Sequence, residues 1–573
     1  MASAMFSSGE FNFGVGGGGG GGEKLVSGKR VDNDAEFEFH HGVKPVDEDF
    51  FFSKYQQQER IQQNLVFDQG LLDDFMLGAL ESQPVCMSSK GAADPGDHGV
   101  GNVEQKKDRR CSSSMASLEL LRSYGNGVKK LDGDRIVQPR GEEELNENSV
   151  AERLSIEGIA RLAGVKFVQG PSSTMDVHSV LGPFGLAFAG LSDEEKQEVQ
   201  LIELLLVCAE KVTYRQFDRA RNLLNQCSYL FSNQGTPVQR LVHYFAEALH
   251  ERIDRETGRL VLDDFWKINE LTRDLLVMNP NRSRIALHQE IPFSQVAQFT
   301  GLQAIIEKVT DAKRIHAIDM CIGSGAHWTI LMQALQNSEL ELLKITAIGT
   351  HSQSQHLMEV TGKRLESFAG AMNLPFSFRL VIVDDLSDLK EDHLKVDFKE
   401  RLVVYSQYYL RTLIGRPNQL DALMKVIAKL NPSLMVVTEP DANHNSPSFV
   451  DRFIETLFFF CAYFDCLETY MKRLDENRLA VESFYFGESI KNIVATEGDE
   501  RTVRNVKIDV WRAFFARFGM VEDELSPSSL YQASLVTKRF RAGRFCTLDR
   551  NGKSLIVGWK NTPILSLSVW KFT

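Results

Sequence analysis

The sequence of 573 residues predicts an α/β protein in which a mainly parallel sheet ends in an antiparallel hairpin and carries an all-helical cap. Two observations predict the sheet. Short apolar runs alternate with helical segments between residues 314 and 460, and an Asn-Gly turn separates two strand-like runs near residue 551. A purely helical pattern before them predicts the cap. A parallel sheet closed by an antiparallel hairpin is the plan of Rossmann-like, methyltransferase-like folds.

Residues 1–150 have the composition of a disordered region, because they are acidic and rich in glycine. Through residue 195 the chain carries 19 Lys and Arg against 31 Asp and Glu, whereas the remainder carries 46 of each. Acidic and aromatic residues alternate at 36–39, 47–52 and 71–80, which is typical either of partner-docking segments or of a solvated linker. The basic run at 106–110 is a candidate nuclear import signal.

Residues 151–190 are expected to form a linker with one short helix, and residues 191–300 a mostly helical cap. Ser192 is a candidate N-cap that acidic residues follow, and apolar residues then recur at helical spacing. The Gly-Thr-Pro sequence at 235–237 ends this pattern, and a further helix is expected over 238–253. These helices should pack as a bundle or cap against the α/β core.

Residues 301–573 are expected to form the α/β core. Apolar runs suited to buried parallel strands occur at 315–318, 345–348, 376–383, 402–405 and 434–437. Helical segments separate these runs, at 328–335, 359–371, 419–430 and 448–460. Residues 492–495 are also strand-like, and the antiparallel end of the sheet is expected at 545–548, 554–559 and 565–572.

A candidate ligand crevice follows the strand at 315–318. Asp319 ends this strand, and Gly323 and Gly325 lie between it and a helix, as in proteins that bind a nucleotide at a helix N-terminus. The next strand ends without the carboxylate that such sites use to hold a ribose. Asp319 therefore either faces a ligand or caps the turn, whereas His316 on the same strand is expected to be a core residue.

Polar residues also follow the strand at 434–437 and should line the same edge of the sheet as Asp319. A glutamate and a histidine, Glu439 and His444, suit acid and base chemistry, but no nucleophile is paired with them in the sequence. Asn443 beside them suits the ordering of a loop equally well. We therefore expect no catalytic residues in this chain.

The motifs after residue 191 together resemble the plant GRAS family of transcriptional regulators. The family's modules occur in order: a leucine-rich region at 201–250, I-H-A-I-D at 315–319 for the V-H-I-I-D signature, a second leucine-rich region at 357–394, a P-F-Y-R-E region at 403–498, and an S-A-W region closing the chain. The body is most similar to the DELLA-type repressors, although neither D-E-L-L-A nor T-V-H-Y-N-P occurs. The resemblance implies a nuclear regulator that binds transcription factors or other GRAS chains through its helical cap.

Leu201, Leu204 and Leu205 form an L-x-x-L-L pattern, which on a helix makes one apolar ridge. Such a ridge either enters a partner's groove or belongs to the core of the cap. Leu223 and Leu224 on the following helical turns join the same candidate partner surface.

A further set of residues is expected to have structural roles, through charge pairs between layers or by packing the terminal hairpin onto the sheet: Glu500, Arg501, Arg504, Trp559, Ser568 and Trp570. The basic cluster of Lys538, Arg539, Arg541 and Arg544 either contacts DNA or an acidic partner, or lies in a solvated loop.

Composition narrows the function. A core without net charge is not expected to bind the phosphate backbone of DNA by itself, so any contact with DNA is expected to be indirect. The eight cysteines form no C-x-x-C pair. No apolar run is long enough to span a bilayer. We expect neither a metal nor a cofactor. Together with the resemblance to the GRAS family, these features predict a nuclear, non-enzymatic regulator. The alternative is an S-adenosylmethionine-dependent, methyltransferase-like enzyme or small-ligand-binding protein that uses Asp319, Gly323 and Gly325.

Overall fold

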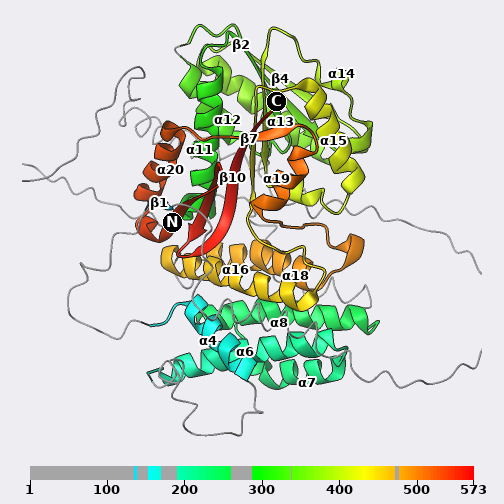
Figure 1. Cartoon of the computed structure of the whole chain (residues 1–573), viewed down its shortest axis with the longest axis vertical. Coiled ribbons are helices and arrows are strands. Elements are labelled where there is room, and N and C mark those ends of the chain that lie inside the picture. The colour runs from blue at the N-terminus through cyan, green and yellow to red at the C-terminus, as the bar shows by residue number, and fades with distance from the viewer. Residues whose placement is uncertain are drawn as a thin grey trace, which may run out of the picture. The chain divides into compact units, whose positions relative to one another are not determined.

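The computed structural model describes residues 135–137, 153–169, 190–259, 287–336, 338–350, 352–471 and 476–572 (Figure 1). The expectations for the acidic and aromatic segments, and for the basic run at 106–110, lie outside these residues. One strand, β1 (Arg135–Val137), falls within the range predicted to be disordered and pairs antiparallel with β8.

A ten-stranded sheet of order β1-β8-β9-β10-β6-β5-β2-β3-β4 forms the centre of the α/β core, with β7 paired to β10. The strands β6, β5, β2, β3 and β4 run parallel, and β10 joins them antiparallel at β6. The predicted fold class is therefore confirmed. The strands after β1 are β2 (Arg314–Asp319), β3 (Leu342–Gly349), β4 (Phe376–Ile382), β5 (Arg401–Gln407), β6 (Leu434–Pro440), β7 (Met520–Asp523), β8 (Cys546–Asn551), β9 (Ser554–Trp559) and β10 (Thr562–Phe572).

Helices cover both faces of the sheet. One face packs against α11 (Pro292–Val309), α12 (Ala326–Leu335), α13 (Ser352–Ala371) and α20 (Pro527–Arg539). The other face packs against α14 (Glu391–Leu394), α15 (Pro417–Leu430) and α19 (Ile508–Ala516). Short turns of 3₁₀-helix connect these elements: η4 (Leu386–Asp388), η5 (Leu410–Thr412), η7 (Gly498–Glu500) and η8 (Gly543–Phe545).

The helical cap combines two distant parts of the chain. The first part supplies α4 (Ile156–Gln169), α6 (Asp193–Thr213), α7 (Phe217–Cys227), η3 (Ser228–Leu230) and α8 (Pro237–Glu256). The second supplies α16 (Phe449–Tyr470), α17 (Glu476–Ala480), the π-helix η6 (Val481–Gly487) and α18 (Glu488–Val494). In Figure 1, α16 and α18 lie between the sheet and α8, and α16 packs on α4, α6 and α8.

Two expectations about these elements need correction. Residues 492–495 are not a strand, because α18 extends through Val494, and a short apolar run does not by itself distinguish a buried strand from a buried helix. The boundary predicted at residue 300 between the cap and the core also needs correction, because helix α11, which begins at Pro292, already belongs to the core. Helix α11 packs on β6 and β10, where a Cβ on Gly301 would lie 2.9 Å from Val436 Cγ1. The missing side chain at Gly301 thus allows the helix to lie close to the sheet.

Local signals in the sequence formed as expected. Ser192 and Glu195 make a capping box at the start of α6, with Ser192 N donating to Glu195 Oε2 at 2.8 Å. Thr236, expected only to belong to a break between helices, also makes a capping box, at the start of α8. The Asn-Gly turn joins β8 to β9, with Asn551 opposite Ser554. Among the helices that the structure describes, none combines the length and apolar composition needed to cross a membrane.

Candidate functional site

Asp319 lies at the carboxyl end of β2, where α/β proteins bind ligands, but its carboxylate is fully buried and bonded within the chain. Trp328 Nε1 donates to Oδ2 at 2.7 Å, and His327 Nε2 lies 2.8 Å from the same oxygen. The backbone N–H of Cys321 donates to Oδ1 at 2.9 Å. Asp319 therefore caps the turn and anchors the first residues of α12.

The glycine turn is also covered by the protein itself. Gly323 and Gly325 adopt φ values of 46° and 64°, which explains why glycine is suited to both positions. A Cβ on Gly325 would lie 2.9 Å from Thr361 Cγ2, and Thr361 Oγ1 donates to the Gly323 carbonyl at 2.9 Å. Helix α13 thus packs directly on the turn. The methyltransferase-like alternative needs an open crevice here, and this geometry does not support it.

His316 is fully buried on the other face of β2. Its Nε2 lies 2.7 Å from Thr346 Oγ1, and its Nδ1 lies 3.0 Å from Glu400 Oε2. Burial, with the nearby charge of Lys344, lowers the pKa of His316 to about 4. The ring is therefore neutral at physiological pH and belongs to the core.

Glu439, Asn443 and His444 lie after β6 but have separate environments. Glu439 is buried, and burial raises the pKa of this carboxyl to about 7, although the Arg411 cation opposes the shift. His444 is fully buried, with Nδ1 2.9 Å from Asn505 Nδ2, whereas Asn443 is exposed. Because Glu439 and His444 are close in the sequence, they could be taken for an acid and base pair. In the fold each of them has different hydrogen-bond partners.

The segment after α18 connects the loop after β6 to the cap. Arg501 Nη1 donates to the His444 carbonyl at 3.4 Å, and Arg504 Nη1 donates to Asn445 Oδ1 at 3.2 Å. Glu500 pairs with Arg255 of α8 at 2.5 Å. Burial and the neighbouring guanidinium groups lower the pKa of Arg501 to about 10. These three charged residues thus hold an interface between elements.

The candidate partner ridge on α6 and α7 is only partly at the surface. Leu201, Leu205 and Leu224 are at most 2% exposed and form the core of the cap, so they do not present a docking ridge in the folded chain. Leu204 and Leu223 are half-buried. The L-x-x-L-L pattern marks the amphipathic period of the helix, but it does not show which leucines remain accessible.

The aromatic residues of the terminal strands pack on opposite faces of the sheet. Trp559 lies in the core beneath α11 and donates from Nε1 to Asp465 Oδ2 at 2.7 Å. Trp570 lies in the core beneath α19 and donates to Ser568 Oγ at 2.8 Å. In the basic cluster near the end of α20, Arg541 donates to the Thr469 carbonyl at 2.9 Å.

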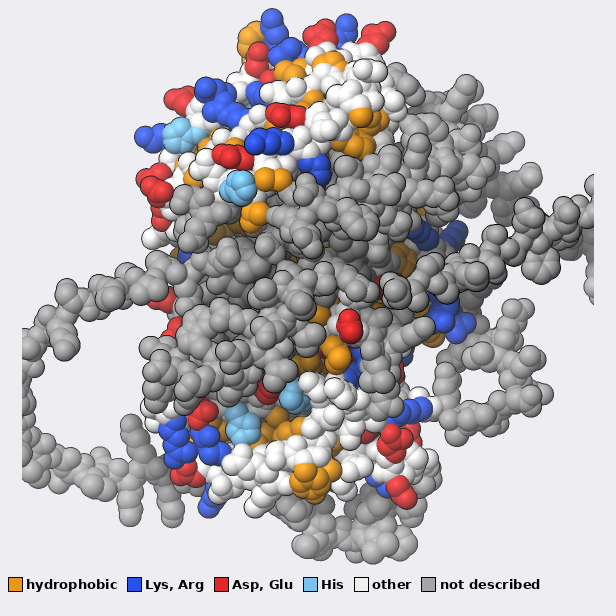
Figure 2. All heavy atoms as spheres, turned by 180° about the vertical axis from the view of Figure 1, so that it is seen from behind, with side chains coloured by type: hydrophobic (Ala, Val, Ile, Leu, Met, Phe, Trp, Pro, Cys, Tyr) orange, Lys and Arg blue, Asp and Glu red, His pale blue; other side chains and the backbone are white. Residues whose placement is uncertain are grey.

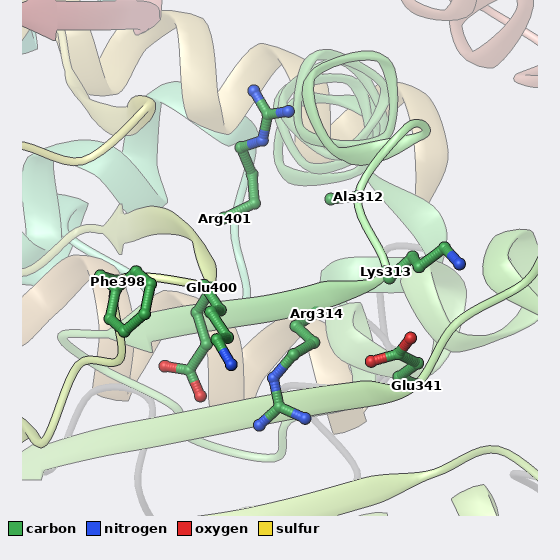
Figure 3. Close-up of a pocket in the computed structure, with 8 residues that line it drawn as sticks. Ala312, Lys313, Arg314, Glu341, Phe398, Glu400 and Arg401 are labelled. Carbon is green, nitrogen blue, oxygen red and sulfur yellow. The ribbon is translucent and has the colours of Figure 1, made fainter.

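A pocket of about 440 Å³ lies at the amino edge of the parallel strands, opposite the glycine turn (Figure 3). Sequence reasoning missed this site, because its residues come from three segments that share no motif. Eight residues line it: Ala312, Lys313, Arg314, Glu341, Phe398, Lys399, Glu400 and Arg401. Within the described residues, no group of three or more His, Cys, Asp or Glu side chains could hold a metal ion.

Charges of both signs are interspersed over the described surface of the face in Figure 2. The sheet, the helices and the covered turn together define the class of protein: an α/β protein with a Rossmann-like sheet, a helical cap and a glycine turn that its own side chains cover. A sequence model of the GRAS domain family matches residues 201–571. The chain belongs to this family, which is a family of plant transcriptional regulators.

Individual relatives agree with this assignment. The chain is 31% identical over 387 residues to the DELLA protein GAIP of Cucurbita maxima, covering 66% of this chain and 64% of that protein. It is 30% identical over 389 residues to the DELLA protein GAI of Arabidopsis thaliana, covering 67% and 70%. The matched part thus spans slightly less than two thirds of the Cucurbita relative. The crystal structure of SCL7 from Oryza sativa has the same fold, with a TM-score of 0.56 at 24% identity, covering 65% of this chain and 99% of that one.

Proposed function

We propose that the chain is a nuclear transcriptional coregulator that binds transcription factors, or other GRAS proteins, through its helical cap and reaches DNA indirectly. The proposal gives no role to catalysis. Family membership supports regulation, and the covered glycine turn argues against a small-molecule reaction at that edge of the sheet.

The observation that carries the proposal is the outer surface of α6, α7 and η3. Leu204 and Leu223 are half-buried there, while Tyr214 and Tyr229 are 44% and 81% exposed. The two helices pack together, with Cys208 Sγ 3.9 Å from the Ala220 carbonyl oxygen. Exposed tyrosines are among the residue types that anchor protein interfaces, because their rings bury a large area at little entropic cost. The half-buried Leu204 and Leu223 on the same helices add some apolar surface.

Charge supports an indirect contact with DNA. Residues 196–573 carry equal numbers of basic and acidic residues, whereas proteins that bind DNA unaided concentrate positive charge on one surface. A partner with its own DNA-binding domain would supply that contact.

The proposal is tested by chromatin immunoprecipitation of the full chain from plant nuclei, together with binding of the recovered fragments by the purified chain. We expect recovery of specific DNA in nuclei and no sequence-specific binding by the purified chain. Tyr214→Ala with Tyr229→Ala should reduce the recovery about tenfold, as loss of two interface anchors does.

Tyr531→Ala is the matched control, because Tyr531 is 45% exposed on α20, away from the cap surface. Circular dichroism confirms that each variant is folded. Tight sequence-specific binding of the recovered DNA by the purified chain contradicts indirect contact. Unchanged recovery with the double tyrosine variant contradicts the cap as the docking surface.

A further inference from the structure

The pocket at the amino edge of the sheet lies where three neighbouring parallel strands begin. Arg314 is the first residue of β2, Arg401 the first of β5, and Glu341 immediately precedes β3. Figure 3 shows Arg314 and Glu400 pointing to one side of the strands and Arg401 to the other. Because these backbones are fixed by the sheet, the pocket's rim is rigid.

Two of the charged residues that line the pocket already form ion pairs. The side chain of Glu400 is 2% exposed and accepts from Lys344 Nζ at 2.8 Å, while Arg401 pairs with Asp311 at 3.0 Å. By contrast, Lys313, Arg314 and Lys399 form no ion pair with any residue that the structure describes. Glu341 is the one remaining acidic residue of the lining, so the three cations still give the pocket an excess of positive charge.

Arg314 adds a second observation. Its Nε is buried and makes no hydrogen bond to the described part of the chain. A buried N–H without an acceptor costs about 1 to 3 kcal/mol. The terminal nitrogens of the same guanidinium group are not among the buried atoms and have no ion pair within the described residues, so they can receive an acceptor from outside the chain. A carboxylate fits, because it can accept two N–H bonds from one guanidinium group.

An apolar side chain lies beside these cations. Phe398 is 92% exposed, the highest value among the large hydrophobic residues that the structure describes. Its turn is fixed by hydrogen bonds: Glu400 N donates to the Asp397 carbonyl at 2.9 Å, Asp397 N to Glu400 Oε2 at 3.1 Å, and Lys399 N to Asp397 Oδ1 at 3.0 Å. Binding to Phe398 would thus require little ordering of the backbone.

We propose that this pocket binds an acidic peptide segment of a partner protein, in which carboxylates flank an aromatic or aliphatic side chain. Arg314, with Lys313 and Lys399, receives the carboxylates, and the ring of Phe398 packs against the apolar side chain. A polyphosphate backbone fits less well, because it offers no apolar side chain to pack against the exposed ring of Phe398. The site lies on the α/β core and does not depend on the function proposed for the cap.

The test uses the purified full chain and a fluorescent, end-blocked peptide of alternating glutamate and phenylalanine, with binding followed by fluorescence anisotropy. We expect saturable binding that salt weakens. Arg314→Ala with Lys399→Ala should weaken it about tenfold, and Phe398→Ala should weaken it by a similar factor. Lys507→Ala with Lys538→Ala, which removes two exposed charges elsewhere, should leave it unchanged.

A charge exchange makes the assignment specific. Arg314→Glu with Lys399→Glu should lose the glutamate peptide and gain a peptide of alternating lysine and phenylalanine. The proposal is overturned if neither peptide distinguishes these variants from the wild type. It is also overturned if inorganic phosphate displaces the peptide and Phe398→Ala has no effect, since that result describes a simple anion site. Phe398 and Lys399 are exposed, so their substitution should not unfold the chain, and circular dichroism checks the folding of the Arg314 variants, because Arg314 is half-buried.

Discussion

The two buried carboxylates at the carboxyl edge of the sheet differ in the donors around them. Asp319 has contacts from Trp328, His327 and the Cys321 backbone, which satisfy both of its oxygens. Glu439 receives the Arg411 backbone N–H on Oε1 at 3.3 Å, while its Oε2 has no hydrogen-bond partner among the described residues. Burial therefore favours the protonated form of Glu439.

Glu439→Gln should change how stability depends on pH. Folding raises the pKa of Glu439 from 4.5 to about 7. The stability that the protonated carboxyl contributes to the folded state is therefore fully present below pH 4.5 and is lost as the pH rises toward 7. A glutamine amide does not ionise, so the variant does not lose stability in this way as the pH rises. At pH 8 the variant should gain up to about 3 kcal/mol in the free energy of unfolding relative to the wild type, and less at pH 5.

Urea denaturation of the full chain at a series of pH values measures this difference. Glu366→Gln, which alters an exposed carboxyl on α13, is the control and should not change the slope with pH. A constant difference between Glu439→Gln and the wild type from pH 5 to pH 8 would show that Glu439 ionises normally in the folded state.

At the level of elements, the cap depends on a buried ion pair between α8 and the π-helix η6. Arg240 and Glu482 are both fully buried, with Nε 3.0 Å from Oε1. Burial raises the pKa of Glu482 to about 7, although Arg240 and Arg478 oppose the shift. Arg240 also donates to Glu468 of α16 at 2.9 Å. The pair therefore determines how three cap helices meet.

Removing one partner of this pair should cost more than removing both. Arg240→Met or Glu482→Leu alone leaves a buried charge without its main partner, and each should lower the free energy of unfolding by about 3 to 5 kcal/mol. The double variant should cost less than the sum of the two. Urea denaturation of the four proteins completes the cycle, and additive costs would show that the two residues do not interact.

Sequence patterns predicted the elements that depend on local residues. The N-cap at Ser192, the parallel strands and the Asn-Gly hairpin depend on neighbouring residues, so their sequence signals are strong. The π-helix and the Arg240–Glu482 pair were not predicted, because residues 242 positions apart in the chain share no local pattern. The same reason hid the amino-edge pocket and the two-part origin of the cap.

For the molecule as a whole, the segment after α18 connects the cap and the α/β core. Glu497 accepts from Arg252 of α8 at 2.9 Å and also pairs with Arg452 of α16. Arg504 reaches from this segment to Asn445 in the loop after β6. The cap and the core should therefore unfold together.

Glu497→Ala tests this coupling. Because Arg252 and Arg452 are buried and would lose their shared carboxylate, we expect a loss of about 1 to 3 kcal/mol in the free energy of unfolding, reduced by the partial exposure of Glu497. Calorimetry should show one transition in the wild type and a broader or split transition in the variant. Asp499→Ala, which removes an exposed neighbouring acid, should leave the transition unchanged.

The two-part cap has a consequence for synthesis. The first cap helices leave the ribosome before the α/β core, but the surfaces of α6 and α8 that pack on α16 stay uncovered until residues 449–494 have been made. Because translation adds about 5 to 20 residues per second, the apolar sides of these helices stay uncovered for many seconds. During this period the uncovered apolar surfaces are prone to aggregation, so the time between synthesis of the two parts of the cap is the vulnerable stage of folding.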